Sequence, residues 1–264
     1  MFINSLKRSV PCKLLVIAAL AALICLNRLV QAAAFVTDIP TLLLVSFGGV
    51  LPFEGLSFYE SLIAAAPIVA QFVLFGEFIS ADMPTVSVYI FSRTRKRDVW
   101  LFGQLIRLSL LSLLCFCVCI ATGVGVGLFA GLRVSSFRIL TLSIALLIVT
   151  LGAWGMLMIC IVAALCIKFK AHTVISAGAV VFIVWVFTMN FIPAPASQYI
   201  LPLTPMSNAL LAAHSGVSQI EFLTARLGEI SYIFPLWWSA VYFVVWAAMF
   251  VFIVRRRITV IDFM

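Results

Sequence analysis

The chain has 264 residues, of which 65% are hydrophobic and only 10% are charged, and its formal net charge is +8. A soluble domain has about 45–50% apolar and about 25% charged residues, so this composition excludes a water-soluble globular protein and makes lipid the solvent of most of the surface. The positive charge indicates cytoplasmic loops rather than nucleic-acid binding, because Lys and Arg collect on the cytoplasmic side of membrane proteins.

The first third of the chain predicts two membrane spans with a short apolar segment between them. Residues 14–35 follow a basic tail, and residues 58–79 form a second run of similar length; a membrane-crossing helix needs roughly 20 apolar residues. Pro67 would bend the second span, either as a hinge or as a tolerated kink. The stretch Thr41–Phe53 is too short to cross, and its Gly-Gly and Pro favour a re-entrant or interfacial segment.

The stretch after the second span, "SADMPTVSVYIFSRTRKRDVW", is too polar to cross a membrane and too apolar for a simple turn. Apolar residues recur in it among small polar ones, and a cluster of basic residues then leads to Trp100. This composition is typical of a short amphipathic helix lying along the inner membrane face. The basic cluster beside an interfacial Trp is also a topology anchor in its own right.

The rest of the chain predicts four more spans, at about residues 101–129, 139–167, 173–192 and 233–254. The third and fourth runs are long, which favours tilt or extension beyond the bilayer. Gly123, Gly127 and Gly131 recur at four-residue spacing in the third run, which would put them on one helix face and permit close helix packing. The glycines lack the Lys and the preceding strand of a phosphate-binding loop, and no such loop occurs in the chain.

The distribution of basic residues favours six spans with both termini in the cytoplasm. The inner side then carries Lys7, Arg8, Lys13, Arg93, Arg95, Lys96, Arg97, Lys168, Lys170 and Arg255 to Arg257. Only Arg133, Arg138 and Arg226 fall outside. Tyr232, Trp237 and Trp238 are expected at the outer interface and Trp100 at the inner one.

The chain carries little that indicates enzymatic chemistry. The seven cysteines lie mostly in apolar runs and are expected to be reduced, small apolar residues. The two histidines, His172 and His214, fall on opposite sides of the membrane in this topology, so a zinc site has little support. We therefore expect no catalytic and no metal-binding residue, and a single transmembrane domain over residues 1–264.

This organisation resembles that of the bacterial type-2 ABC transporter permeases. In that family a coupling helix between spans two and three has an acidic entry, which Glu77 and Asp82 resemble, and a basic exit, which "YIFSRTRKRDVW" resembles. The Pro-containing stretch 191–212 is similar to the short interfacial or re-entrant helix that the family often has between spans five and six. The chain lacks the Gly that often flanks the coupling helix and has Asp82-Met83-Pro84 there, which leaves the start of that helix open.

The resemblance implies a permease of the bacterial plasma membrane that pairs with a second permease, identical or related, and with two copies of a separate ABC ATPase. ATP and Mg would be bound by that ATPase, and this chain would hold no cofactor. The residues that would transmit ATPase closure to the spans are Glu77, Asp82, Tyr89, Ser92, Arg93, Arg95 and Arg97.

The resemblance also implies that spans two and five line the transport path. Their polar groups are few: Gln71, Ser176, Thr188 and Asn190. An apolar wall fits export of a hydrophobic or amphipathic substrate, such as an antimicrobial peptide, a drug or a lipid-like molecule, by analogy. The alternative is a secondary transporter or channel without an ATPase, which usually has ionisable residues at mid-membrane. Here the candidates Arg28, Glu60, Glu77 and Arg107 each lie near a span end, where they are expected to snorkel.

Overall fold

The computed structural model describes the backbone of residues 2–31, 36–48, 63, 66–71, 97–166, 171–188, 199–204, 208, 214–215 and 234–260. This part of the chain is helical, as the composition predicts. Its helices are α1 (Phe2–Gln31), α2 (Ile39–Phe47), α4 (Arg97–Phe129), α5 (Phe137–Cys166), α6 (Ala171–Thr188), the 3-10 turn Leu201–Leu203 and α10 (Leu236–Val260). The two-residue strands β1 (His214–Ser215) and β2 (Phe234–Pro235) pair in parallel.

The helices agree with the predicted spans to within a few residues in most places. α4, α5, α6 and α10 overlie the third, fourth, fifth and sixth predicted spans. α1 begins 12 residues before the predicted start at residue 14, so the expected basic tail is helical and continuous with the apolar run. Of the second predicted span, the structure describes residues 63 and 66–71, which are helical.

Two helical segments in the described part are long and apolar enough to cross a membrane: Val10–Gln31 in α1 and Leu105–Phe129 in α4. Two shorter apolar helical segments are Phe137–Leu151 in α5 and Trp237–Ile253 in α10. A helix rises 1.5 Å per residue, so a segment of 25 residues is about 37 Å long and exceeds the roughly 30 Å of bilayer hydrocarbon. Only the first two segments meet both the length and the composition required of a membrane span.

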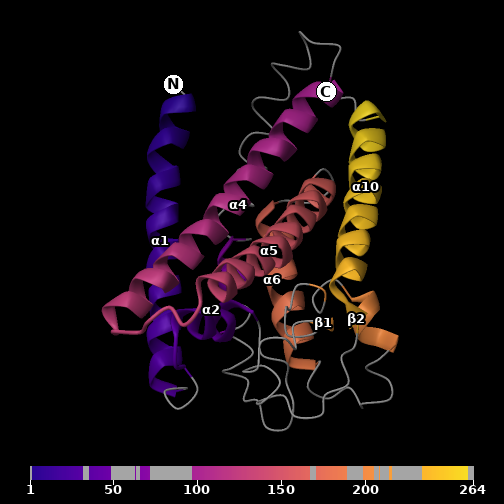
Figure 1. Cartoon of the computed structure of the whole chain (residues 1–264). Coiled ribbons are helices and arrows are strands. Elements are labelled where there is room, and N and C mark those ends of the chain that lie inside the picture. Colours follow the sequence, from indigo (N-terminus) through magenta and orange to yellow (C-terminus); the bar gives the residue numbers. More distant parts are fainter. Residues whose placement is uncertain are drawn as a thin grey trace.

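The ends of the helices sort into two levels (Figure 1). The N-terminus, the start of α4 and the C-terminal end of α10 lie at one end of the molecule, at the top of the view. The turn that joins α4 to α5 and the start of α10 lie toward the other end. The start of α1 and the end of α10 therefore lie at the same end of the molecule.

The turn between α4 and α5 is built around one glycine. Gly131 has a φ of +77°, a left-handed conformation that glycine adopts without a steric cost. The N–H of Gly131 donates to Leu128 O at 3.0 Å, and the N–H of Leu132 donates to Gly127 O at 3.0 Å. This pair of bonds is the Schellman motif that ends many helices. The prediction that Gly131 contributes to a packing face is therefore wrong: it lies beyond α4 and terminates it.

α2 is a short helix enclosed by its neighbours. Asp38 caps it by accepting a hydrogen bond from Thr41 N at 3.0 Å, and all nine of its residues are buried. Nine residues span about 14 Å, too short to cross a bilayer, which agrees with the prediction that this region is not a seventh span. Ile39–Phe47 is covered by protein on every face, and residues 49–53 lie outside the described part.

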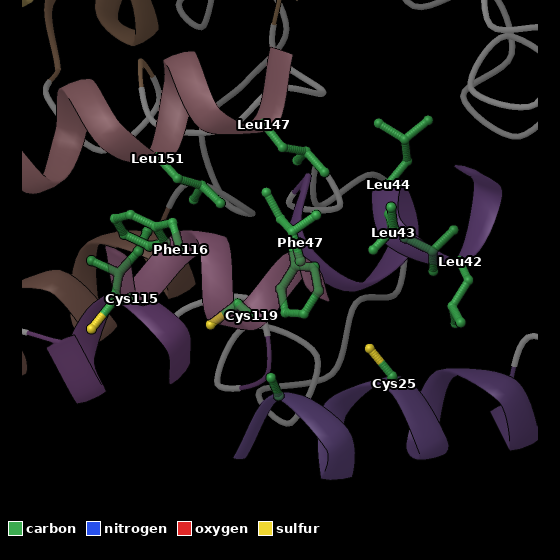
Figure 2. Close-up of a cluster of buried hydrophobic side chains, with 14 of the residues drawn as sticks. Cys25, Leu42, Leu43, Leu44, Phe47, Cys115, Phe116, Cys119, Leu147 and Leu151 are labelled. Carbon is green, nitrogen blue, oxygen red and sulfur yellow. The ribbon is translucent and has the colours of Figure 1, made fainter. Parts of the chain in front are cut away.

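The apolar core lies where α1, α2, α4 and α5 meet (Figure 2). Leu43 and Phe47 of α2 point toward Cys119 of α4 and Leu147 of α5 in this view, and all four side chains belong to one buried cluster. The described cysteines are free, as expected. Cys25, Cys115 and Cys119 are buried, whereas Cys12 and Cys117 are exposed. The three buried thiols pack as small side chains in the apolar core.

Candidate functional site

The predicted coupling loop falls almost entirely outside the described residues. Glu77, Asp82, Tyr89, Ser92, Arg93 and Arg95 all lie in residues 72–96, of which nothing is described. Arg97 is the first residue of α4. That end of α4 lies at the same level as the two chain termini (Figure 1). The coupling role predicted for these residues stays a prediction.

Gln71, a predicted pathway residue, lies in a buried polar contact between segments distant in sequence. Only 5% of its surface is exposed, and its Nε2 donates a hydrogen bond to Ser112 Oγ of α4. Ser112 is itself fully buried. In apolar surroundings such a bond between helices contributes about 0.6–2 kcal/mol. The contact joins the described part of the second predicted span to α4.

The absence of a side chain at Gly155 of α5 makes room for this contact. A Cβ at position 155 would lie 2.8 Å from Gln71 Nε2 and 3.1 Å from Phe116 Cε2, and it would overlap Ser112 Oγ. Three helical segments thus meet at Gln71, Ser112 and Gly155, which we call the polar junction. Sequence reasoning found only Gln71. A single Ser and a single Gly inside apolar runs give no signal, although Ser112 shares a helix face with the buried Leu108, Cys115 and Cys119.

The other predicted pathway residues do not join the polar junction. Ser176 is exposed on α6. Thr188 is the last residue of α6, and the position of its side chain is not described. Asn190 lies in residues 189–198, outside the described part. Of the predicted pathway residues, Gln71 is the one that the described part of the chain places in a buried contact.

Arg28 is a buried cation near the end of α1. Only 3% of its surface is exposed, so the expectation that it snorkels to the surface is wrong. The physical reason is that α2 and α4 pack against α1 and cover this face. Arg107 of α4, in contrast, is exposed. Ionisable side chains buried within membrane proteins are costly and commonly functional.

A second polar cluster holds the segment before α10 against that helix. Asn208 is fully buried; its Nδ2 donates to Pro202 O at 3.0 Å and to Thr204 O at 2.7 Å, and its Oδ1 accepts from Ser239 Oγ at 2.6 Å. Two further donors from α10 reach the same turn, Trp238 Nε1 to Pro202 O and Tyr242 Oη to Leu203 O, each at 3.0 Å. We call this set the Asn208 clasp.

Asn208 and the turn that it holds lie within the predicted interfacial or re-entrant stretch 191–212, and the other residues of the Asn208 clasp belong to α10. Tyr199, Ile200 and Leu203 expose apolar surface beside the first turn of α10, where Trp237 is 64% exposed. Exposed aromatic and aliphatic groups at the end of an apolar helix are typical of the membrane–water boundary. The described part of this stretch is thus a turn fixed to α10 with an apolar outer face.

Among the described residues, no group of three or more His, Cys, Asp or Glu side chains is placed to hold a metal ion. The comparisons with known proteins add no assignment. No protein-family model matches the chain, and neither the curated proteins nor the solved structures contain a match to it.

Proposed function

We propose that this chain is the membrane permease subunit of an ATP-driven transporter of the type-2 ABC class, working in the plasma membrane of a bacterium. It would cross the membrane six times, pair with an identical or related permease, and bind two copies of a separate ATPase. The ATPase would hold ATP and Mg and carry out hydrolysis. This chain would form the path and receive the mechanical signal.

The observation that carries the proposal is the common level of the termini and of the start of α4 (Figure 1). In the proposed topology both termini are cytoplasmic. The coupling loop must then lie on the same side as the termini, because the ATPase binds there. Arg97 begins α4 at that level, and the proposed coupling loop directly precedes it in the sequence. The apolar segments Val10–Gln31 and Leu105–Phe129 supply the membrane-crossing lengths that the proposal requires.

The polar junction supports a path for apolar cargo. Gln71 donates to Ser112 within the protein, so in this arrangement its amide is not offered to a cargo molecule. An apolar lining fits hydrophobic or amphipathic substrates, such as antimicrobial peptides, drugs or lipid-like molecules. Export is the direction we propose, by analogy with systems that have a separate ATPase.

A second candidate function is a secondary transporter or channel without an ATPase. The burial of Arg28 favours it, because buried ionisable residues mark ion and substrate pathways in that class. The two candidates differ in one requirement. Only the ABC permease needs a second protein that hydrolyses ATP.

The test is purification of the tagged chain from its host in mild detergent, followed by identification of stoichiometric partners. We expect an ATPase subunit to co-purify with the wild type and to be lost from Arg93→Glu/Arg97→Glu. Arg133→Glu/Arg138→Glu is the matched control, since it reverses two charges in and beside the α4–α5 turn. That variant should keep the ATPase.

Purification without any ATPase in several detergents would overturn the ABC proposal. In that case, substrate uptake by vesicles containing the chain alone, driven by an ion gradient, would support the secondary transporter. Equal ATPase loss from both charge-reversed variants would remove the coupling role from Arg93 and Arg97.

A further inference from the structure

Three helix ends that are distant in sequence bring basic residues to one end of the molecule. These are the start of α1, the start of α4 and the last turns of α10, all at the level of the chain termini (Figure 1). They carry Lys7, Arg8, Lys13, Arg97, Arg255, Arg256 and Arg257. We call this set the basic end. Arg255 and Arg256 are exposed to solvent.

Most of these basic residues lie close to one end of an apolar helical segment, and Lys13 lies within the first turns of one. The apolar segment of α1 begins at Val10, two residues after Arg8, and that of α10 ends at Ile253, two residues before Arg255. Arg97 precedes Leu105 by eight residues, about 12 Å along the helix. If these segments lie in the hydrocarbon, the basic groups are held at the depth of the lipid phosphates.

We propose that the basic end binds the headgroups of anionic phospholipids in the leaflet on the side of the chain termini. The position of the charges favours lipid over nucleic acid or a soluble acidic protein, because the charges are distributed over several helix ends beside apolar segments. Clusters of Lys and Arg next to a membrane span are typical of this recognition, with about 1 kcal/mol per residue near a charged surface. The inference rests on the membrane placement in the proposed function and not on the ATPase.

The opposite end of the molecule provides an internal comparison. Arg133 and Arg138 are exposed in and just after the turn between α4 and α5. Asp38 lies beside that turn, where its carboxylate accepts a hydrogen bond from Ser135 Oγ and Ile39 N donates to Arg133 O at 3.3 Å. Two arginines can therefore be neutralised at each end, with the same change of charge and with exposed side chains in both cases.

The experiment uses the purified full chain in a neutral detergent, without any ATPase. Thermal unfolding is followed as phosphatidylglycerol or phosphatidylcholine with the same acyl chains is added, and an apparent affinity is taken from the shift. We expect phosphatidylglycerol to stabilise the wild type more. Arg255→Gln/Arg256→Gln should lower the apparent affinity for phosphatidylglycerol by about 25-fold, because each of the two charges is worth about fivefold.

Arg133→Gln/Arg138→Gln should change the affinity for phosphatidylglycerol less than about threefold. Arg255→Lys/Arg256→Lys should keep that affinity, because the positive charge rather than the shape of the guanidinium is required. Equal effects of the two Gln pairs would overturn the proposal, as would equal stabilisation by the two lipids. Soluble glycerol phosphate at the same concentration should give no shift; an equal shift would indicate a free-anion site instead.

If Arg255→Gln/Arg256→Gln does not accumulate in the membrane, the same titration on Lys7→Gln/Arg8→Gln decides the question at the start of α1. Unchanged phosphatidylglycerol affinity in that variant would overturn a shared role for the basic end. Loss of the ATPase interaction leaves this result unaffected, so the two proposals can fail separately.

Discussion

Two glycines on α4 determine how closely α2 approaches that helix. A Cβ at Gly123 would lie 2.7 Å from Leu43 Cδ2, 3.2 Å from Phe47 Cε2 and 3.3 Å from Cys25 Sγ. A Cβ at Gly127 would lie 3.0 Å from Ile39 Cγ1. The predicted close packing at these two positions is therefore confirmed. Gly125, between them, faces open space.

We expect Gly123→Val to lower the free energy of unfolding by about 1–3 kcal/mol, because it overpacks a filled contact. Gly125→Val is the control. It makes the same change in side chain and helix propensity at a position where no atom lies within 4 Å of the new Cβ. Denaturant or thermal unfolding in detergent measures the difference. Equal losses in the two variants would mean that α2 does not rest on the Gly123 face.

The polar junction can be tested by a compensating pair. Gly155→Ala should destabilise the protein, because the new methyl group overlaps Ser112 Oγ and crowds Gln71. Ser112→Ala removes the hydroxyl and leaves Gln71 Nε2 without this acceptor, at a cost of about 1–3 kcal/mol. The double variant should lose at least about 0.5 kcal/mol less than the sum of the single losses, as expected for residues in contact. Additive losses in a double-mutant cycle would contradict the junction.

At the scale of elements, the 3-10 turn Leu201–Leu203 depends on α10 for its position. Its outer face is exposed, and its backbone carbonyls are bound by the Asn208 clasp. Three hydrogen bonds of that clasp involve the Asn208 amide. Because three residues form no stable helix alone, we expect the turn to depend on these bonds.

We expect Asn208→Ala to release this turn and to lower stability by about 1–3 kcal/mol, because it leaves buried partners unsatisfied. Trp238→Phe removes one donor to Pro202 O and should cost less. The neighbouring Trp237 is 64% exposed, so Trp237→Phe is the control with little effect. Limited chymotrypsin cleavage at Tyr199, together with thermal unfolding, reports both effects. Unchanged cleavage in Asn208→Ala would show that other contacts hold the turn.

The boundaries of the elements show how far sequence patterns extend. Hydropathy located α4 and α5 closely, because an apolar run of this length satisfies its backbone polar groups by forming a helix. It missed the first 12 residues of α1, since a basic segment gives no hydropathy signal even where the helix continues through it. It could not determine whether Thr41–Phe53 is buried, because burial depends on α1, α4 and α5 closing around α2.

At the scale of the whole molecule, the two levels of helix ends predict the sidedness of the chain. We expect Val134→Cys, in the α4–α5 turn, to react with a membrane-impermeant maleimide in intact cells. The wild type should stay unlabelled. The exposed Cys12 lies near the start of α1, away from the α4–α5 turn, and the exposed Cys117 lies within the apolar segment Leu105–Phe129. Labelling of Val134→Cys only after permeabilisation would reverse the assignment of sides and contradict the proposed cytoplasmic termini.

Sequence alone determined that this chain is helical and apolar, and it located the described long helices, because hydropathy and backbone hydrogen bonding act within each segment. It also singled out Gly123, Gly127 and Gln71. Tertiary structure decided what these residues contact: α2 for the glycines, and Ser112 beside Gly155 for Gln71. It also decided that Arg28 is enclosed and that Gly131 ends a helix. The physical reason is that the rotation and pairing of helices depend on side-chain contacts between segments far apart in the chain, which no local pattern encodes.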